Sequence, residues 1–161
     1  MNPPILIRDY RFSDLDALIA LFHDSIRRVA SRDYTAAQIM AWAPDTVDRD
    51  AWAAKRASRP TWVAEIENVV VGFTDLEPDG HLDFMYVHPD YQGIGVATAL
   101  LAKVEAEARA LAISRFFAEV SITARPFFER RGFRVMAPQT VAIRGETLTN
   151  YRMEKSLVSL A

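Results

Sequence analysis

A short glycine-containing loop between an apolar segment and a long amphipathic segment constrains this chain more than any other feature. Residues 86–97 have the sequence YVHPDYQGIGVA. The apolar run 82–87 before the loop predicts a covered central strand, and residues 95–113 after it carry apolar side chains at helical spacing. Glycine lets a ligand approach the backbone closely, and the unpaired N–H groups of a first helical turn attract anions. The segment therefore predicts a strand–loop–helix unit with a candidate phosphate site.

The two glycines, Gly93 and Gly95, taken alone favour a turn that needs glycine only for its geometry over a phosphate site. A P-loop is excluded, because no Gly-Lys-Ser/Thr sequence follows. The dinucleotide fingerprint is excluded too, because its third glycine is missing and the loop lies late in the chain.

The remaining pattern predicts helices first, then antiparallel strands, a strand–helix–strand unit and a final hairpin. Expected strands are 5–10, 62–66, 69–76, 82–87, 116–120, 135–143 and 147–153. Expected helices are 15–29 with Ser13-Asp14 as N-cap, one from Thr35 to before Pro44, 48–57, 95–113, and 124–131 with Gly132 at its C-cap. This order favours an α/β (α+β) fold with one mixed, mostly antiparallel sheet, in a single domain over residues 1–161.

Composition narrows the classes of function. Half of the 161 residues are hydrophobic, which suffices for a core, and a net charge of -2 argues against a nucleic-acid-binding face. The absence of cysteine excludes disulfides, thiolate zinc sites and a cysteine nucleophile, and we expect no metal. No stretch resembles a signal peptide or a membrane span. We therefore expect a cytoplasmic protein with neither nucleic acid nor membrane as partner.

Two ordered motifs resemble the GNAT superfamily of N-acetyltransferases, in its small bacterial-type branch. Gln92, Gly95 and Ala97 fill the pattern Gln/Arg-x-x-Gly-x-Gly/Ala of the acetyl-CoA signature, after Val87-His88-Pro89. Residues 124–133, ARPFFERRGF, are similar to the second hallmark, Ala-x-x-φ-Tyr-Glu-Lys-x-Gly-Phe, where φ is apolar. The order of strands and helices over the whole chain resembles the superfamily as well.

The resemblance implies a sheet with a central parallel splay, flanked by helices. It also implies direct transfer of an acetyl group from acetyl-CoA to a primary amine of a small molecule or protein, in a ternary complex. A non-catalytic acyl-CoA-binding or regulatory module is the alternative, and a nucleotide-binding domain is a weaker one. The final hairpin could pair in a homodimer or close a monomer. The implied cofactor-binding residues are Tyr86, Val87, Gln92, Gly93, Ile94, Gly95, Val96, Ala97, Ser121, Phe127, Phe128 and Arg131.

Two positions depart from the family pattern. Phe128 stands where many relatives carry a tyrosine proposed to protonate the departing thiolate, and Ser121 stands in place of an asparagine. The general acid is therefore open between Tyr86, Tyr151 and a water molecule.

Three residues are candidates for the general base that removes the amine proton: His81, Asp83 and Glu119. Each has a structural explanation of its own, namely a turn residue, a hydrogen-bond acceptor and an ion pair with an arginine. His81 and Asp83 are expected on one face of the same strand.

The acceptor pocket of the superfamily is shaped by the first helices and the last hairpin. This implicates His23, Ile26, Tyr34, Gln38, Trp42 and Trp62. The aromatic rings could form the wall of a site for a flat or cationic substrate, but residues at helical and strand spacing are more often core, and core packing is the stronger explanation. The chain contains no signal that chooses between an aminoglycoside, a polyamine, an amino acid and a protein amine.

Overall fold

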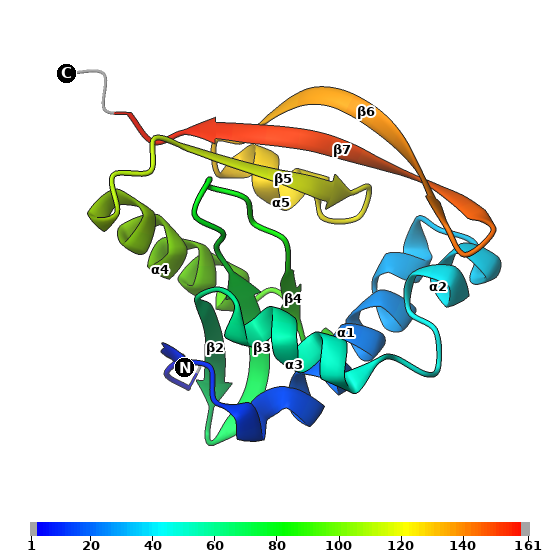
Figure 1. Cartoon of the computed structure of the whole chain (residues 1–161), viewed down its shortest axis with the longest axis horizontal. Coiled ribbons are helices and arrows are strands. Elements are labelled where there is room, and N and C mark those ends of the chain that lie inside the picture. Colours follow the sequence, from blue (N-terminus) through cyan, green and yellow to red (C-terminus); the bar gives the residue numbers. More distant parts are fainter. Residues whose placement is uncertain (1–2, 159–161) are drawn as a thin grey trace.

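Two hydrogen-bonded sheets form the centre of the computed structural model, which describes residues 3–158 (Figure 1). The first has the strand order β1-β2-β3-β4 and the second the order β5-β7-β6. The strands are β1 Leu6–Asp9, β2 Thr61–Ile66, β3 Val69–Asp75, β4 Met85–Val87, β5 Arg115–Ser121, β6 Arg134–Ile143 and β7 Glu146–Ser156. All pairs within the sheets are antiparallel. A parallel bridge between His81 and Phe117 joins the two sheets, which separate beyond it.

The fold class expected from the sequence is confirmed, and the splay divides the expected sheet into two hydrogen-bonded halves. The expected strand 82–87 is shorter than predicted, since only Met85–Val87 pairs with β3. The cause is Asp75, whose Oδ1 accepts from the amides of Asp83 and Phe84 at 2.9 and 3.0 Å. A buried carboxylate thus takes up N–H groups that a longer strand would use, and the expectation that His81 and Asp83 share a strand face is wrong.

Five helices surround the sheets within the described residues. They are α1 Leu15–Arg28, α2 Ala36–Trp42, α3 Arg49–Ala57, α4 Val96–Ala110 and α5 Arg125–Arg130, with short 3-10 turns at Phe12–Asp14, Ala30–Arg32 and Pro89–Tyr91. Thr35 and Gln38 form a capping box at the start of α2. Asp14 occupies the expected N-cap position of α1, but it does not cap the helix through its side chain. The Asp14 carboxylate makes no cap bond to α1 and instead accepts from Arg8 and from the Arg11 amide.

The core lies where α4 and α1 cover the sheets. Leu100 and Val104 of α4 and Leu18 of α1 are fully buried, as are Phe73 of β3 and Phe116 of β5. Apolar burial of this kind supplies most of the stabilisation of a domain. Within residues 3–158, no helix is long and apolar enough to cross a membrane.

The final hairpin reaches across the molecule to α2 (Figure 1). The Tyr34 hydroxyl donates to the carbonyl of Thr149 at 2.6 Å, and Gln38 Nε2 donates to that of Thr147 at 2.9 Å. From the hairpin turn, Arg144 donates to the carbonyl of Ala41 at 2.7 Å. These three bonds hold the α1–α2 segment against β7 and close one side of the space between the sheets.

Candidate active site

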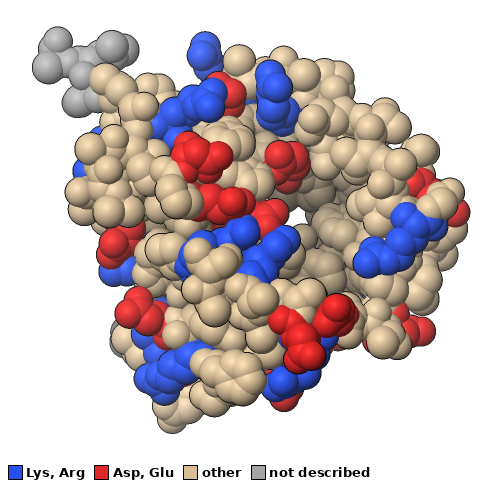
Figure 2. Space-filling model, viewed as in Figure 1, with Lys and Arg blue, Asp and Glu red and all other residues tan. Residues whose placement is uncertain are grey.

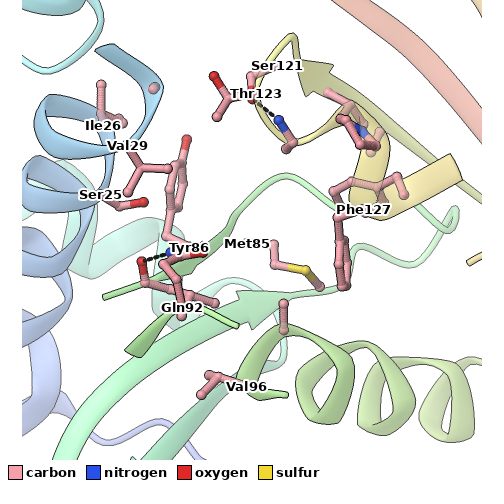
Figure 3. Close-up of a pocket in the computed structure, with 18 of the residues that line it drawn as sticks. Ser25, Ile26, Val29, Met85, Tyr86, Gln92, Val96, Ser121, Thr123 and Phe127 are labelled. Atoms are coloured by element: carbon pink, nitrogen blue, oxygen red, sulfur yellow. Dashed lines mark hydrogen bonds between the residues drawn. The ribbon is translucent and has the colours of Figure 1, made fainter. Parts of the chain in front are cut away.

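A cavity of about 520 Å³ occupies the splay between β4 and β5. Its walls come from α1, from β4 with the following loop and the start of α4, from β5, and from α5. Figure 2 shows that the molecule is hollowed near the middle of the viewed face, with acidic and basic side chains side by side on one flank. In Figure 3, Ile26 and Val29 lie opposite Phe127, with Met85 and Tyr86 between them. The cavity therefore joins the predicted cofactor loop to the predicted acceptor helices.

The glycine loop lines the cavity and has open space around its two glycines. Gly93 and Gly95 have φ angles of +75° and +97°, and a Cβ at either position would meet nothing within 4 Å. Gly95 is the N-cap of α4, so the amides of the first turn have no partner within the helix. Gln92 Nε2 donates to the Val87 carbonyl at 3.0 Å and ties the loop to the end of β4. Backbone amides without a partner in the helix, next to open space, form a suitable binding site for a pyrophosphate.

Backbone polar groups of two strand edges face the splay. The His88 N–H donates to the Val71 carbonyl, and the Phe84 carbonyl accepts from the Asp75 N–H. The even-numbered residues of the segment 84–88, which contains β4, therefore bond to β3. Alternation along a strand then directs the N–H of Val87 towards β5. On β5, Phe117 bonds to Gly80 and Leu82, so the backbone groups of Glu119 and Ser121 face β4. An extended chain inserted between these edges could pair with both.

The α5 side of the cavity is aromatic with basic groups beside it. Phe127 and Phe128 line it, and the Arg131 guanidinium lies 4.3 Å from the centre of the Phe127 ring. Arg131 also donates to the Thr98 hydroxyl of α4 at 2.6 Å. The Ser121 hydroxyl accepts from the Ala124 amide at 3.0 Å and so stabilises the turn before α5.

The three candidate bases belong to one network of charges. Asp83 and Glu119 line the cavity, whereas His81 lies behind them and contacts Glu119 through Nε2 at 2.6 Å. The hydrogen bond to Glu119 is the largest cause that raises the pKa of His81 to about 9. The same bond lowers the pKa of Glu119. Asp83 is bound by Arg59 at 3.0 Å and by Lys55 at 3.1 Å.

Tyr86 projects into the cavity between α1 and the 121–124 loop (Figure 3). Its ring packs edge-on against Phe22 of α1 and Phe84. Burial raises the pKa of its hydroxyl above the ordinary value, and Trp42 opposes part of that rise. Tyr151 does not line the cavity, and its ring lies under the Arg125 guanidinium at 4.5 Å. Of the two tyrosines expected as candidate general acids, Tyr86 is therefore the one that lines the cavity.

Of the residues expected in the acceptor pocket, Ile26 and Trp42 line the cavity. Tyr34 is buried between β7 and the Ile122 amide, and Gln38 is held in its capping box. The His23 ring contacts the Pro44 carbonyl at 2.7 Å. Trp62, expected in the pocket, instead packs against Leu101 and Val104 of α4, because the register of β2 turns it to that face. Ile94, assigned to the cofactor, packs into the core under the loop.

Sequence reasoning missed several lining residues. Those on α1 and its extension are Ser25, Val29, Ala30 and Arg32, and those around α5 are Thr123, Ala124, Pro126 and Arg130. The spacing 25, 29, 32 matches the face of α1 that carries Ile26, so helical periodicity could have found them. Arg130 lies within the second motif itself.

The comparisons with known proteins agree with this geometry. The model of the acetyltransferase (GNAT) domain family matches residues 30–155. The uncharacterised N-acetyltransferase YafP of Escherichia coli (strain K12) is 38% identical over 149 residues, which are 92% of this chain and 94% of that protein.

Two solved structures resemble the fold closely. A GCN5-related N-acetyltransferase from Rhodopseudomonas palustris has a TM-score of 0.91 and 36% identity, over 97% of this chain and 98% of that one. The PaiA N-acetyltransferase of Thermoplasma acidophilum, solved with coenzyme A, has a TM-score of 0.78 and 19% identity, over 95% and 99%. The glycine loop, the splay and these matches together establish that the chain belongs to the GNAT family of acetyl-CoA-dependent N-acetyltransferases.

Proposed function

We propose that this chain transfers the acetyl group of acetyl-CoA directly to a primary amine while both are bound in the cavity. The proposal rests on the observation that one continuous cavity is lined by the glycine loop, by β4 and by Glu119 of β5. Holding both reactants in one geometry can by itself supply much of the rate. The chain has no cysteine to form a thioester intermediate, which favours direct transfer.

The cofactor would lie along the splay. Amides of the glycine loop, from Gln92 to Ala97, would hold the pyrophosphate, with Arg131 beside it. The pantetheine arm would pair with the backbone edges of β4 and β5, and would pass Phe127 and Phe128 at the α5 wall. The Val87 N–H points into the same gap and would donate to the thioester carbonyl oxygen, where negative charge develops during attack.

Glu119 is the best-placed general base. Glu119 lines the cavity, and contact with His81 lowers its pKa, so its carboxyl group is ionised at neutral pH. It would take a proton from the acceptor ammonium, and the freed nitrogen would attack the thioester carbonyl carbon. The C–S bond then breaks, and the sulfur leaves with the electron pair. Asp83 is less available because two cations share its charge.

Tyr86 is the favoured donor of the proton that the departing sulfur takes up. Its hydroxyl lines the cavity and stays neutral because burial raises its pKa. Phe128 has no proton to give, and Tyr151 is outside the cavity. A coenzyme A thiol is acidic enough that a weak donor is sufficient.

A small-molecule amine is the acceptor class that the walls favour. Ile26, Val29 and Trp42 form an apolar side of the cavity, and the bonds from α2 to the hairpin close it. An apolar wall with a few polar groups at one end suits the recognition of a compact ligand.

Glu119→Gln tests the proposal directly. We expect kcat/KM to fall about 100-fold or more, the typical worth of a positioned base, with unchanged acetyl-CoA affinity by calorimetry. The acceptor used would be the best substrate from a library of amino acids, polyamines, aminoglycosides and peptides. Full activity of Glu119→Gln would exclude Glu119 as the base. Binding of acetyl-CoA with no turnover on any amine would favour a non-catalytic module.

A further inference from the structure

His81 lies at the point where the two sheets join. The Phe117 amide donates to the Gly80 carbonyl at 3.1 Å, and the Leu82 amide donates to the Phe117 carbonyl at 3.0 Å. Beyond this parallel bridge the β4 segment and β5 diverge and leave the cavity between them. The side chain at position 81 therefore affects how the two walls of the cavity, formed by β4 and β5, are joined.

The His81 ring is held on three sides. It stacks on Phe117 with ring centres 4.9 Å apart and an interplanar angle of 18°. Nδ1 contacts Glu77 Oε1 at 2.7 Å, and Nε2 contacts Glu119 Oε2 at 2.6 Å. Only the imidazolium form carries N–H groups on both nitrogens, so the geometry requires the charged form.

The surrounding charges support that form. Besides Glu77 and Glu119, the Asp79 carboxylate accepts from the His81 amide, and Asp83 lies near. The facing cations are already engaged: Arg59 with Glu77 and Asp83, Lys55 with Asp83, and Arg115 with Glu154. The pKa of His81 is raised to about 9 by Glu119 first and then Glu77, against the opposing effect of burial. A protonated ring cannot accept the amine proton, so His81 itself is not the base.

Glu119 depends on this ring for its place. Within residues 3–158 its ion-pair contact is with His81, and its side chain is 43% exposed. A carboxylate on an exposed strand position samples several rotamers unless a partner selects one. The bridge Glu77–His81–Glu119 supplies that partner from the other sheet.

We propose that His81, held by Glu77, is a positioning residue that fixes the Glu119 carboxylate at the cavity wall and makes the sheet junction and the base a single unit. The proposal rests on the proposed function, because it assumes that Glu119 accepts the amine proton. It also assigns a role to Glu77, a residue that lies outside both sequence motifs.

The first test compares pH profiles of kcat for the wild type and His81→Gln with one acceptor, so that ionisation of the acceptor cancels in the ratio. Glutamine can still donate to Glu119, but it carries no charge and cannot bridge two carboxylates. At pH 7.5 we expect roughly a 10- to 100-fold lower kcat, the scale of a small misplacement of a reacting group, with little change in KM for acetyl-CoA.

The sign of the pH dependence follows from the two groups. The ratio of the wild-type kcat to the kcat of His81→Gln should fall as pH rises through about 9, where His81 loses its charge. The acid limb of His81→Gln should move to higher pH, because the pKa of Glu119 is no longer lowered. A loss of kcat that is equal at every pH would indicate a merely structural role and overturn the proposal.

The second test measures the titration of the His81 imidazole and needs no activity assay. The chain has three histidines, so the imidazole NMR signals of His81 are identified by their absence in His81→Gln. We expect a midpoint near pH 9 in the wild type and a lower midpoint in Glu77→Gln. Glu154→Gln is the matched control: it removes the Arg115 ion pair beside the same Phe117 ring and should leave the midpoint unchanged.

The outcomes separate the two ideas. A wild-type midpoint near the ordinary 6.5, with Glu119→Gln inactive, overturns the positioning role and leaves the proposed function standing. Full activity of Glu119→Gln would show that Glu119 is not the base. The positioning role of His81 would then be overturned as well, whatever its midpoint. A midpoint near 9 with a pH-dependent loss in His81→Gln supports the proposal.

Discussion

The two sides of the cavity are built by different means. The cofactor side is mostly backbone: a glycine loop, the first turn of α4 and the inward edge of β4. The opposite side depends on side chains that meet from distant parts of the chain, such as His81 with Glu119. Arg59 connects this network, through Glu77, to the buried Arg56–Asp75 pair, which lies outside the cavity. Backbone sites follow from local sequence, whereas the side-chain network requires the whole fold. The first should therefore tolerate substitution nearby better than the second.

Asp75→Asn should have the largest effect on stability, because it breaks the buried centre of the side-chain network. Both Asp75 and Arg56 side chains are fully buried, and their contact is 2.9 Å. Removing one partner leaves an uncompensated buried charge, so we expect a loss of about 3–5 kcal/mol. Urea unfolding at pH 7.5 measures it.

Asp16→Asn is the matched control, since the Asp16–Arg49 pair is largely exposed. Exposed pairs contribute about 0–1 kcal/mol. Equal losses in the two variants would contradict the claim that burial makes the Asp75–Arg56 pair important for stability.

Gly72→Ala should have a smaller effect, on the cofactor side. A Cβ there would lie 2.9 Å from Val96 Cγ1, 3.1 Å from Leu100 Cδ1 and 3.2 Å from the Tyr86 carbonyl. Overpacking of this kind costs about 1–3 kcal/mol, and side-chain ends can shift to relieve part of it.

A double-mutant cycle with Val96→Ala sharpens this prediction. Removing the Val96 methyl groups should make Gly72→Ala less costly than in the wild-type background, as expected for residues in contact. Strict additivity would show that the contact with Val96 is not the source of the loss.

The sequence predicted the parts of the site that depend on neighbours along the chain. The loop with Gly93 and Gly95 lies beside the cavity, and the second motif places Phe127 at its wall. Both are short-range patterns in which the backbone conformation determines the geometry.

The features that the sequence could not predict depend on which residues, brought together by the fold, compete for the same hydrogen-bond partners. The strand expected at 82–87 is cut short because Asp75, eight residues earlier, takes the amide of Asp83. Trp62 faces α4 because the strand register turns it there. The i, i+4 spacing of Glu77 and His81 is visible in the sequence, but the second partner of His81, Glu119, lies 38 residues further along the chain.

Calorimetry on the wild type and Gly95→Trp measures whether the glycine loop holds acetyl-CoA. The indole would fill the open space at the loop. Gly145→Trp is the matched control, because Gly145 also has a positive φ and open surroundings but lies in the β6–β7 turn. If the loop holds the pyrophosphate, we expect binding by the wild type and Gly145→Trp and none by a folded Gly95→Trp. Equal binding by all three would contradict it.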